Sequence, residues 1–209
     1  MLAGEDRNDR RSLRVLLEAA CPDMRGRIVE INDPMPLRQA SGANLSDRVG
    51  RLARLARARA ARENADLACV FVHEDLDAAD GDEYLQTRKR VQKALEAELG
   101  TAHYVLAVAE IEAWLLLFPE ALAGLVSSWS VPKKYLHRDT GKLSDPKRIL
   151  MREVGSGSRR YRESDAPDVL VKAVELGCHT TPVGTNRSWV QLHADAVDCC
   201  REHLKGNRG

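Results

Sequence analysis

Apolar residues at helical spacing predict a series of helices along this chain. Leu13, Leu16 and Leu17 fall on one face of a helix over residues 8–20, and Pro22 disfavours helical geometry in the residue before it. Gly100 is expected to end a later helix, over residues 83–99, because glycine is typical of the position just beyond a helix. Further helices are expected over residues 46–64, 110–118, 165–177 and 187–204.

Short continuous apolar runs separate the first of these helices. Residues 67–72 and 103–109 are typical of strands that are buried on both faces of a sheet. Shorter strands are expected at residues 2–4 and 27–31. Strands that alternate with helices indicate βαβ units. The sequence therefore predicts an α/β fold, with a small parallel sheet flanked by helices.

The pattern changes after Pro119. Residues 127–164 are mostly polar and suggest a partly ordered insertion, with a mobile loop around Gly155 and Gly157. We therefore expect an α/β domain over residues 1–125. A basic, mainly helical C-terminal extension over residues 126–209 would pack on it.

Composition narrows the class of protein. The chain has 209 residues, of which 44% are apolar, enough to bury a core. Its formal net charge of +1 gives no information about partners. That information has to come from the local distribution of charge. The sequence has neither an apolar run of about 18 residues nor the basic and apolar start of a signal peptide. A cytoplasmic protein without a membrane segment is expected.

The five cysteines form no C-x-x-C pair, and Cys199 directly precedes Cys200. This spacing suits neither a zinc knuckle nor an ordinary disulfide. Cys69 lies within an apolar run and is expected to be a small buried residue. We interpret all five cysteines as reduced thiols.

Acidic residues follow three of the predicted strands. They are Glu5 and Asp6, then Glu74, Asp75 and Asp77, then Glu110 and Glu112. Neighbouring parallel strands lie about 4.8 Å apart, so carboxylates at their ends can converge. Oxygen ligands favour Mg²⁺, Mn²⁺ or Ca²⁺ over zinc, and such ions can support phosphodiester cleavage. The alternative is that these acids are ordinary solvated residues of loops and helix starts.

Three motifs together resemble a TOPRIM domain, the module of topoisomerases, primases and OLD-family nucleases. They are G-E-D near the start, D-L-D after a hydrophobic strand, and A-E-I-E-A-W-L-L further on. The last motif, with D-P-K-R-I-L and Y-R-E-S-D-A-P-D-V-L, more narrowly resembles the TOPRIM-related domain of unknown function 4276. Members of that family are often encoded beside restriction or phage-defence genes. The resemblance implies a TOPRIM-like, Rossmann-like fold and a nuclease dependent on Mg²⁺ (or Mn²⁺).

Carried onto this chain, the resemblance implies Glu5, Asp75 and Asp77 as metal ligands and catalytic residues. Glu110 or Glu112 would be a further acid at the site. The family usually has glutamate just before the glycine, whereas here the acid follows it as Glu5. That displacement favours an alternative, a non-catalytic regulatory subunit that binds nucleic acid or a partner. Because the sequence has no ATP-binding motif, energy coupling would come from an ATPase or another defence-system protein.

A second resemblance leads to a different function. The opening L-A-G-E-D-R-N-D-R-R-S-L-R-V-L-L-E-A resembles that of a response-regulator receiver domain. Asp75 would then be the phosphate acceptor. This interpretation lacks the later lysine at a strand end, and it does not explain the A-E-I-E-A-W-L-L motif.

Basic residues gather in the second half of the chain. Residues 133–162 hold ten basic side chains against three acidic ones, which is typical of a surface that binds a polyanion. DNA or RNA is therefore the expected partner, and Tyr135 and Tyr161 could stack on unpaired bases. The alternative is a solvated insertion. The expected phosphate-binding residues are Lys133, Lys134, Lys147, Arg148, Arg159 and Arg160.

Overall fold

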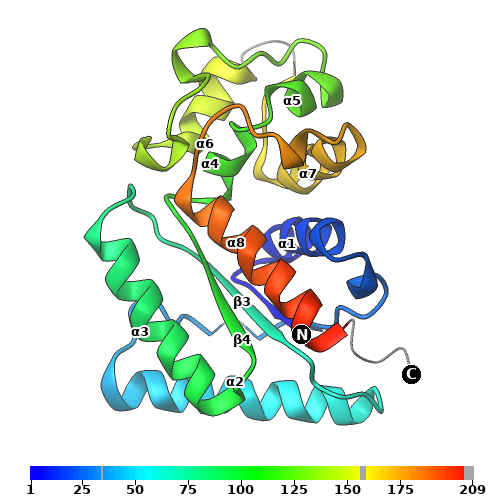
Figure 1. Cartoon of the computed structure of the whole chain (residues 1–209). Helices are drawn as coiled ribbons and strands as arrows, with labels where there is room; N and C mark the ends of the chain where they lie inside the picture. Colours follow the sequence, from blue (N-terminus) through cyan, green and yellow to red (C-terminus); the bar gives the residue numbers. More distant parts are fainter. Residues whose placement is uncertain (34, 156–158, 205–209) are drawn as a thin grey trace.

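The computed structural model describes residues 1–33, 35–155 and 159–204. Its centre is an all-parallel sheet of four strands in the order β2-β1-β3-β4 (Figure 1). Helices cover both faces, so the predicted α/β class with a helical C-terminal region is confirmed. The strands are β1 (Leu2–Ala3), β2 (Glu30–Ile31), β3 (Val70–Asp75) and β4 (Ala102–Ala107).

The longer helices lie close to where the sequence predicts them. The helices are α1 (Arg7–Ala20), α2 (Gly42–Arg62), α3 (Asp82–Leu99), α4 (Ile111–Leu115), α5 (Pro119–Leu125), α6 (Pro146–Ile149), α7 (Ala166–Glu175) and α8 (Arg187–Cys199). Short 3₁₀ helices span Pro22–Met24, Lys133–Tyr135, Thr140–Lys142, Glu163–Asp165 and Cys178–Thr180, and π-helical turns span Leu150–Val154 and Cys200–Leu204. No helix among the described residues is long and apolar enough to cross a membrane.

One predicted helix is divided. The helix expected over residues 110–118 ends at Leu115, and α5 begins at Pro119. Proline suits the first position of a helix but disfavours helical geometry in the preceding residue. Phe118 accordingly has φ −123° and ψ 63°, so it separates α4 from α5.

Strand β3 begins and ends three residues later than the apolar run that predicts it. It takes in His73 and Asp75, which pair in register with Val105 and Ala107 of β4. The pairing depends on backbone groups, so polar side chains at the sheet end do not interrupt it. The first acids of the expected acidic loop therefore belong to the strand, which fixes where they lie.

The two faces of the sheet are covered by different helices. On one face, α2 and α3 pack against Val70, Val72 and Tyr104. On the other, α1 and α8 pack against Phe71 and Val105 (Figure 1). Because side chains alternate along a strand, neighbouring residues of β3 belong to different cores.

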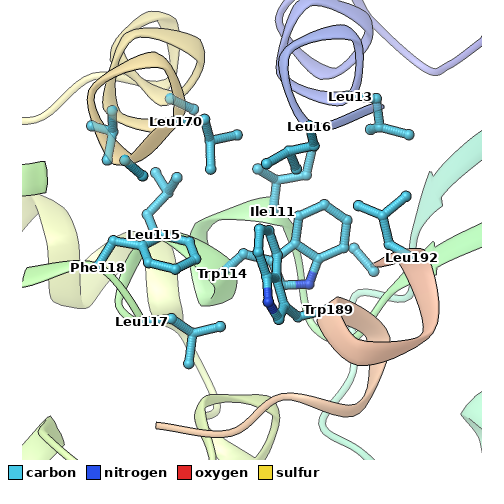
Figure 2. Close-up of a cluster of buried hydrophobic side chains, with 14 of the residues drawn as sticks. Leu13, Leu16, Ile111, Trp114, Leu115, Leu117, Phe118, Leu170, Trp189 and Leu192 are labelled. Atoms are coloured by element: carbon cyan, nitrogen blue, oxygen red, sulfur yellow. The ribbon is translucent and has the colours of Figure 1, made fainter. Parts of the chain in front are cut away.

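Helices α4 to α7 gather at the carboxyl end of the sheet, at the top of Figure 1, whereas α8 runs along the sheet face. Figure 2 shows Trp114 of α4 and Trp189 of α8 side by side, beneath side chains of α1 and α7. The centroids of the two indole rings are 5.9 Å apart. Both tryptophans are buried. In the polar stretch 127–164, the described residues Trp129, Leu150 and Tyr161 are buried in the same core. The described part of that stretch thus contributes side chains to the core. Residues 156–158, within the expected mobile loop, lie outside the described residues.

Two disulfides contradict the expectation of five reduced thiols. Cys21 is bonded to Cys200, and Cys69 is bonded to Cys199, while Cys178 is free. Helical geometry directs the adjacent cysteines at the end of α8 toward different neighbours, one at the end of α1 and one at the start of β3. Adjacency in sequence therefore did not prevent each from pairing with a distant cysteine.

Ser188 joins three elements just behind the sheet end. Its Oγ accepts hydrogen bonds from the backbone N–H of Val108 and the indole N–H of Trp114, both at 2.9 Å. It donates to Oδ1 of Asn186, which caps α8. This buried hydroxyl therefore fixes β4, α4 and α8 relative to one another.

Replacing this hydroxyl is expected to destabilise the fold. Ser188→Ala leaves two buried donors without an acceptor, at a cost of about 1–3 kcal/mol for each. Urea unfolding should show a lower midpoint with an unchanged slope. Ser128→Ala, at an exposed position, is the matched control and should stay within about 0.5 kcal/mol of wild type. Equal stability of the two variants would contradict the role of Ser188.

Candidate functional site: an acidic cleft

A cleft of about 280 Å³ lies at the carboxyl end of the sheet. The five acids expected at the catalytic site line it, namely Glu5, Asp75, Asp77, Glu110 and Glu112. The sheet order places it at the topological switch point, because the chain leaves β1 toward β2 on one side and β3 lies on the other. Ligands of open α/β sheets bind at such points. The carboxylate residues of the acidic cleft are Glu5, Asp6, Asp9, Asp75, Asp77, Glu110, Glu112 and Glu163.

Backbone pairing beyond the strands brings the two main acidic segments together. The N–H of Asp77 donates to the carbonyl of Ala109 at 2.8 Å, and the N–H of Ala109 donates to the carbonyl of Ala78 at 2.8 Å. Asp77 and Ala109 have φ 56° and 57°. Non-glycine residues adopt this left-handed geometry only where the surroundings hold them in it. The pairing thus places the D-L-D and A-E-I-E motifs at adjoining edges of the cleft.

The Glu5 segment is held by Arg10. This arginine is buried, and it donates to the carbonyl of Gly4 at 3.1 Å and to Glu30 at 3.2 Å. A β-carbon at Gly4 would lie 3.1 Å from Cγ of Arg10, so glycine allows the close approach. The turn after β1 is therefore fixed, and it carries Glu5 to the rim of the cleft.

Asp6 and Asp9 have a structural role that the sequence analysis did not assign. The Asp6 carboxylate accepts from the N–H of Asp9 at 2.9 Å, and the Asp9 carboxylate accepts from the N–H of Asp6 at 3.3 Å. They form a capping box at the start of α1. Both also line the cleft, so the helix start brings additional negative charge to it.

His73 lies buried beneath the acids. Its Nε2 lies 3.5 Å from Oδ1 of Asp75, and its Nδ1 lies 3.8 Å from Oδ2 of Asp9. Neither ring nitrogen, nor Asp75 Oδ1, has a hydrogen-bond partner within the described chain. Burial lowers the pKa of His73, but the nearby carboxylate of Asp75, with the charges of Asp9 and Glu5, outweighs this effect and raises the pKa.

The opposite wall of the cleft combines Glu110, Glu112 and Lys147. Glu110 accepts from the backbone N–H of Lys147 at 2.7 Å, and the ammonium of Lys147 lies 3.5 Å from Glu110 and 3.4 Å from Glu163. Glu112 is buried and accepts from the hydroxyl of Tyr161 at 3.1 Å. Burial and the charge of Glu110 raise the pKa of Glu112 to about 8. This group therefore holds or releases a proton near neutral pH.

Mutual repulsion also affects Glu5. Burial and the charge of Asp75 raise its pKa from 4.5 to about 7, despite a smaller opposing effect of His73. The pKa of Asp9 and that of Glu110 are raised as well, chiefly by burial. A cluster of carboxylates that resist ionisation is a typical setting for a divalent cation.

The donor set fits a hard cation better than zinc. The cleft offers carboxylate oxygens, which Mg²⁺ and Mn²⁺ prefer. Across the described residues, no three carboxylates each place an oxygen atom within 4.8 Å of the other two. The arrangement therefore fits an ion held by one or two carboxylates, with water or phosphate oxygens completing its shell.

Two acids of the segment 74–77 bind partners outside this shared space. Glu74 points to the other face of the sheet, where it accepts from the N–H of Arg38 at 2.9 Å and the hydroxyl of Tyr104 at 2.6 Å. It fixes the loop before α2. Asp77 lines the cleft but accepts from the Arg38 guanidinium at 2.7 Å and is largely exposed. Asp75 is therefore the acid of this motif that lies deepest in the site.

The predicted phosphate-binding residues do not form one group. Lys147 belongs to the cleft, whereas Lys134 pairs with Glu153 at 2.6 Å and Arg159 pairs with Asp165 at 2.6 Å. Tyr161 is buried against Trp129, so its expected role in base stacking is wrong. The remaining basic candidates, Lys133, Arg148 and Arg160, are exposed.

The buried acid predicts a pH dependence of stability. The folded-state pKa of Glu112, about 8, exceeds its usual value of 4.5. Its contribution to stability is therefore present below about pH 4.5 and is lost as the pH rises toward 8. Glu112→Gln should remove this loss in metal-free buffer, so the variant gains on the order of 5 kcal/mol over wild type by pH 9.

Thermal unfolding from pH 5 to pH 9, with EDTA present, measures this difference. The variant should gain in melting temperature over wild type up to about pH 8 and then keep a constant lead. Glu153→Gln, at a carboxylate outside the cleft, is the control. A constant gap between the Glu112 variant and wild type at every pH would show that Glu112 ionises normally.

Comparisons with known proteins identify no relative of this chain. No protein-family model matches the chain, and neither a curated protein nor a solved structure matches it significantly. The acidic cleft at the switch point of a parallel sheet is therefore the feature from which a function is inferred.

Proposed function

We propose that this protein is a metal-dependent nuclease that cleaves phosphodiester bonds of DNA or RNA in the acidic cleft. The observation that carries the proposal is the convergence of acids from the ends of β1, β3 and β4 above the buried His73. The resemblance of the same segments to TOPRIM domains supports the same chemistry. We also propose, on that resemblance, a cytoplasmic role in a phage-defence or restriction system.

Glu5 and Asp75 would hold the Mg²⁺ or Mn²⁺. Asp77 would join them as a ligand once its carboxylate leaves the guanidinium of Arg38. A divalent ion bound there would supply charge to stabilise the phosphate oxygens and would acidify a water. His73 orients Asp75 from below, since its Nε2 faces Oδ1 of that carboxylate. Asp75 is therefore the residue on which the proposed activity depends most.

Residues of the opposite wall of the cleft would bind phosphate and transfer protons. Lys147 is the one cationic side chain that lines the cleft, as far as the described residues define it. Its ammonium, held between Glu110 and Glu163, would contact a phosphate oxygen of the substrate. Glu112, with its pKa near 8, would accept or donate a proton close to neutral pH. Exposed Lys133, Arg148 and Arg160 would contact the nucleic-acid backbone further out.

A non-catalytic subunit that binds nucleic acid or a partner is the second candidate. The separation of the carboxylate oxygens favours it, because a preformed three-ligand site is not assembled in the described residues. A partner could then complete the site or use the cleft only as a charged surface.

A receiver-like phosphoacceptor is a third candidate. The switch-point position of Asp75 favours it, since receivers share the strand order 2-1-3-4. Lys147 supplies a lysine to the cleft, although from α6 rather than from a strand end. Its ammonium is engaged with Glu110 and Glu163 rather than Asp75. The nuclease therefore remains the leading proposal.

Cleavage assays with a paired substitution test the nuclease. Wild-type protein is incubated with supercoiled plasmid, single-stranded DNA and RNA in Mg²⁺, Mn²⁺ or EDTA. Asp75→Asn should reduce metal-dependent cleavage by roughly 100-fold or more, because loss of even an outer-shell partner of a metal can lower activity by about 100-fold. Asp47→Asn, on the exposed surface of α2, should cleave like wild type.

Metal binding without catalysis is measured in parallel. Mn²⁺ should raise the melting temperature of wild type and of Asp47→Asn, but not that of Asp75→Asn. Stabilisation by Mn²⁺ without cleavage of any substrate would favour the non-catalytic candidate. Cleavage that persists in Asp75→Asn, or in EDTA, would contradict the proposed site.

A further inference from the structure

A second cluster of metal-ligating side chains lies at the opposite end of the sheet. Cys69, His103 and Cys199 place one ligand atom each within 4.8 Å of one another. Cys69 immediately precedes β3, His103 is paired in register with Phe71, and Cys199 ends α8. Because the acids follow the carboxyl ends of the strands and Cys69 precedes an amino end, the cluster is separate from the acidic cleft.

We propose that Cys69, Cys199 and His103 form a zinc site that alternates with the Cys69–Cys199 disulfide. The disulfide form holds the two sulfurs bonded to each other. The reduced form presents two thiolates and one imidazole to Zn²⁺. This inference does not depend on the proposed nuclease.

The donor chemistry selects zinc over the ions of the acidic cleft. Two thiolates with one imidazole are a recognised zinc set, and soft sulfur ligands disfavour Mg²⁺. Both cysteines are buried, so little of either side chain faces bulk solvent. No comparable group of three donors occurs elsewhere in residues 1–33, 35–155 and 159–204.

His103 is already oriented as zinc-binding histidines are. Its Nδ1 lies 3.7 Å from Oδ1 of Asp195, and its ring stacks on Phe71 with centroids 4.8 Å apart. Asp195 is itself held by Arg88 at 3.1 Å and Gln191 at 2.9 Å. A carboxylate on one ring nitrogen typically fixes the tautomer and leaves the other nitrogen to the metal. Nε2 is therefore the ligand atom.

The exchange between the two forms needs a modest rearrangement. Zn–S bonds of about 2.3 Å in a tetrahedral site separate two sulfurs by roughly 3.8 Å. The Cα atoms of Cys69 and Cys199 lie 6.6 Å apart, toward the upper end of the span of disulfides. Side-chain rotation can therefore open the pair while the backbone stays in place.

The redox step balances with a dithiol as reductant. Its two thiols pass two electrons and two protons to the Cys69–Cys199 disulfide, which becomes two thiols while the dithiol becomes a disulfide. Zn²⁺ then displaces the two thiol protons as it binds. Oxidation by a disulfide of another molecule reverses the sequence and releases the ion.

The fourth coordination position faces space that water can enter. Cys69 and Cys199 line a cavity of about 720 Å³, together with His203 and Met24. Three protein ligands and one water make a four-coordinate zinc. Cys21 and Cys200 form a separate disulfide that is not part of the three-donor group.

Zinc stoichiometry of the full chain tests the proposal. The protein is reduced with a water-soluble phosphine, and the phosphine is then removed under anaerobic conditions. Zn²⁺ is added in the presence of excess Mg²⁺, and unbound metal is removed by gel filtration. Elemental analysis should find about one zinc per chain in the reduced protein and almost none in the oxidised protein. Co²⁺ in place of zinc should give the absorption bands of thiolate coordination.

Matched variants identify the donors. His103→Phe keeps a ring on Phe71. It should weaken zinc binding by more than the roughly 100-fold that loss of an outer-shell partner can cost, as should Cys69→Ser, so neither variant should retain stoichiometric zinc. Cys178→Ser and the double variant Cys21→Ser/Cys200→Ser should bind like wild type. Circular dichroism checks that each variant is folded.

Two results would overturn the assignment. One is a folded, reduced wild type that retains no stoichiometric zinc. The other is zinc that survives in His103→Phe and Cys69→Ser, or is lost in the Cys21/Cys200 double variant, since other groups would then be the ligands.

Discussion

Parallel pairing of β3 with β4 is the constraint on which the site depends. The ladder runs from Val70 and Ala102 to Asp75 and Ala107, and backbone bonds carry it beyond the strands to Ala109. Acidic segments that lie far apart in sequence are thereby forced to adjoin. The protein compensates for their repulsion only in part, with one lysine and several retained protons. A negative potential at this edge is therefore built into the backbone pairing rather than added by flexible side chains.

The alternation of side chains along β3 divides three consecutive polar residues between two tasks. Glu74 enters the face covered by α2 and α3 and holds the loop before α2 through backbone N–H groups. His73 and Asp75 enter the other face, where α1 supplies Asp9. A run of polar residues at a strand end thus anchors a loop on one face of the sheet and places a carboxylate in the acidic cleft on the other. The same alternation sends Phe71 toward His103 at the far end of the sheet.

The sequence predicted the fold class because hydrophobic periodicity reports local burial. It also predicted most of the acids that reach the cleft, since parallel strands share one carboxyl edge, although Glu74 faces the other side of the sheet and Asp9 and Glu163 were not predicted. It did not predict Lys147 as part of the cleft, because that residue arrives on α6 through packing of a polar stretch with few local signals. Tyr161 was misassigned for the same reason. The disulfides were missed because their partners lie 179 and 130 residues apart, and no local spacing encodes such contacts.

The adjacent cysteines at the end of α8 give the chain a particular covalent topology. In the disulfide form, one crosslink reaches α1 and the other reaches the start of β3, so almost the whole described chain lies within two nested rings. A single cut in the backbone between Cys69 and Cys199 would leave both fragments joined. A protease that nicks the exposed segments of the second half would therefore change the connectivity of the molecule without dividing it. The sheet and the helix that covers it would part only after reduction.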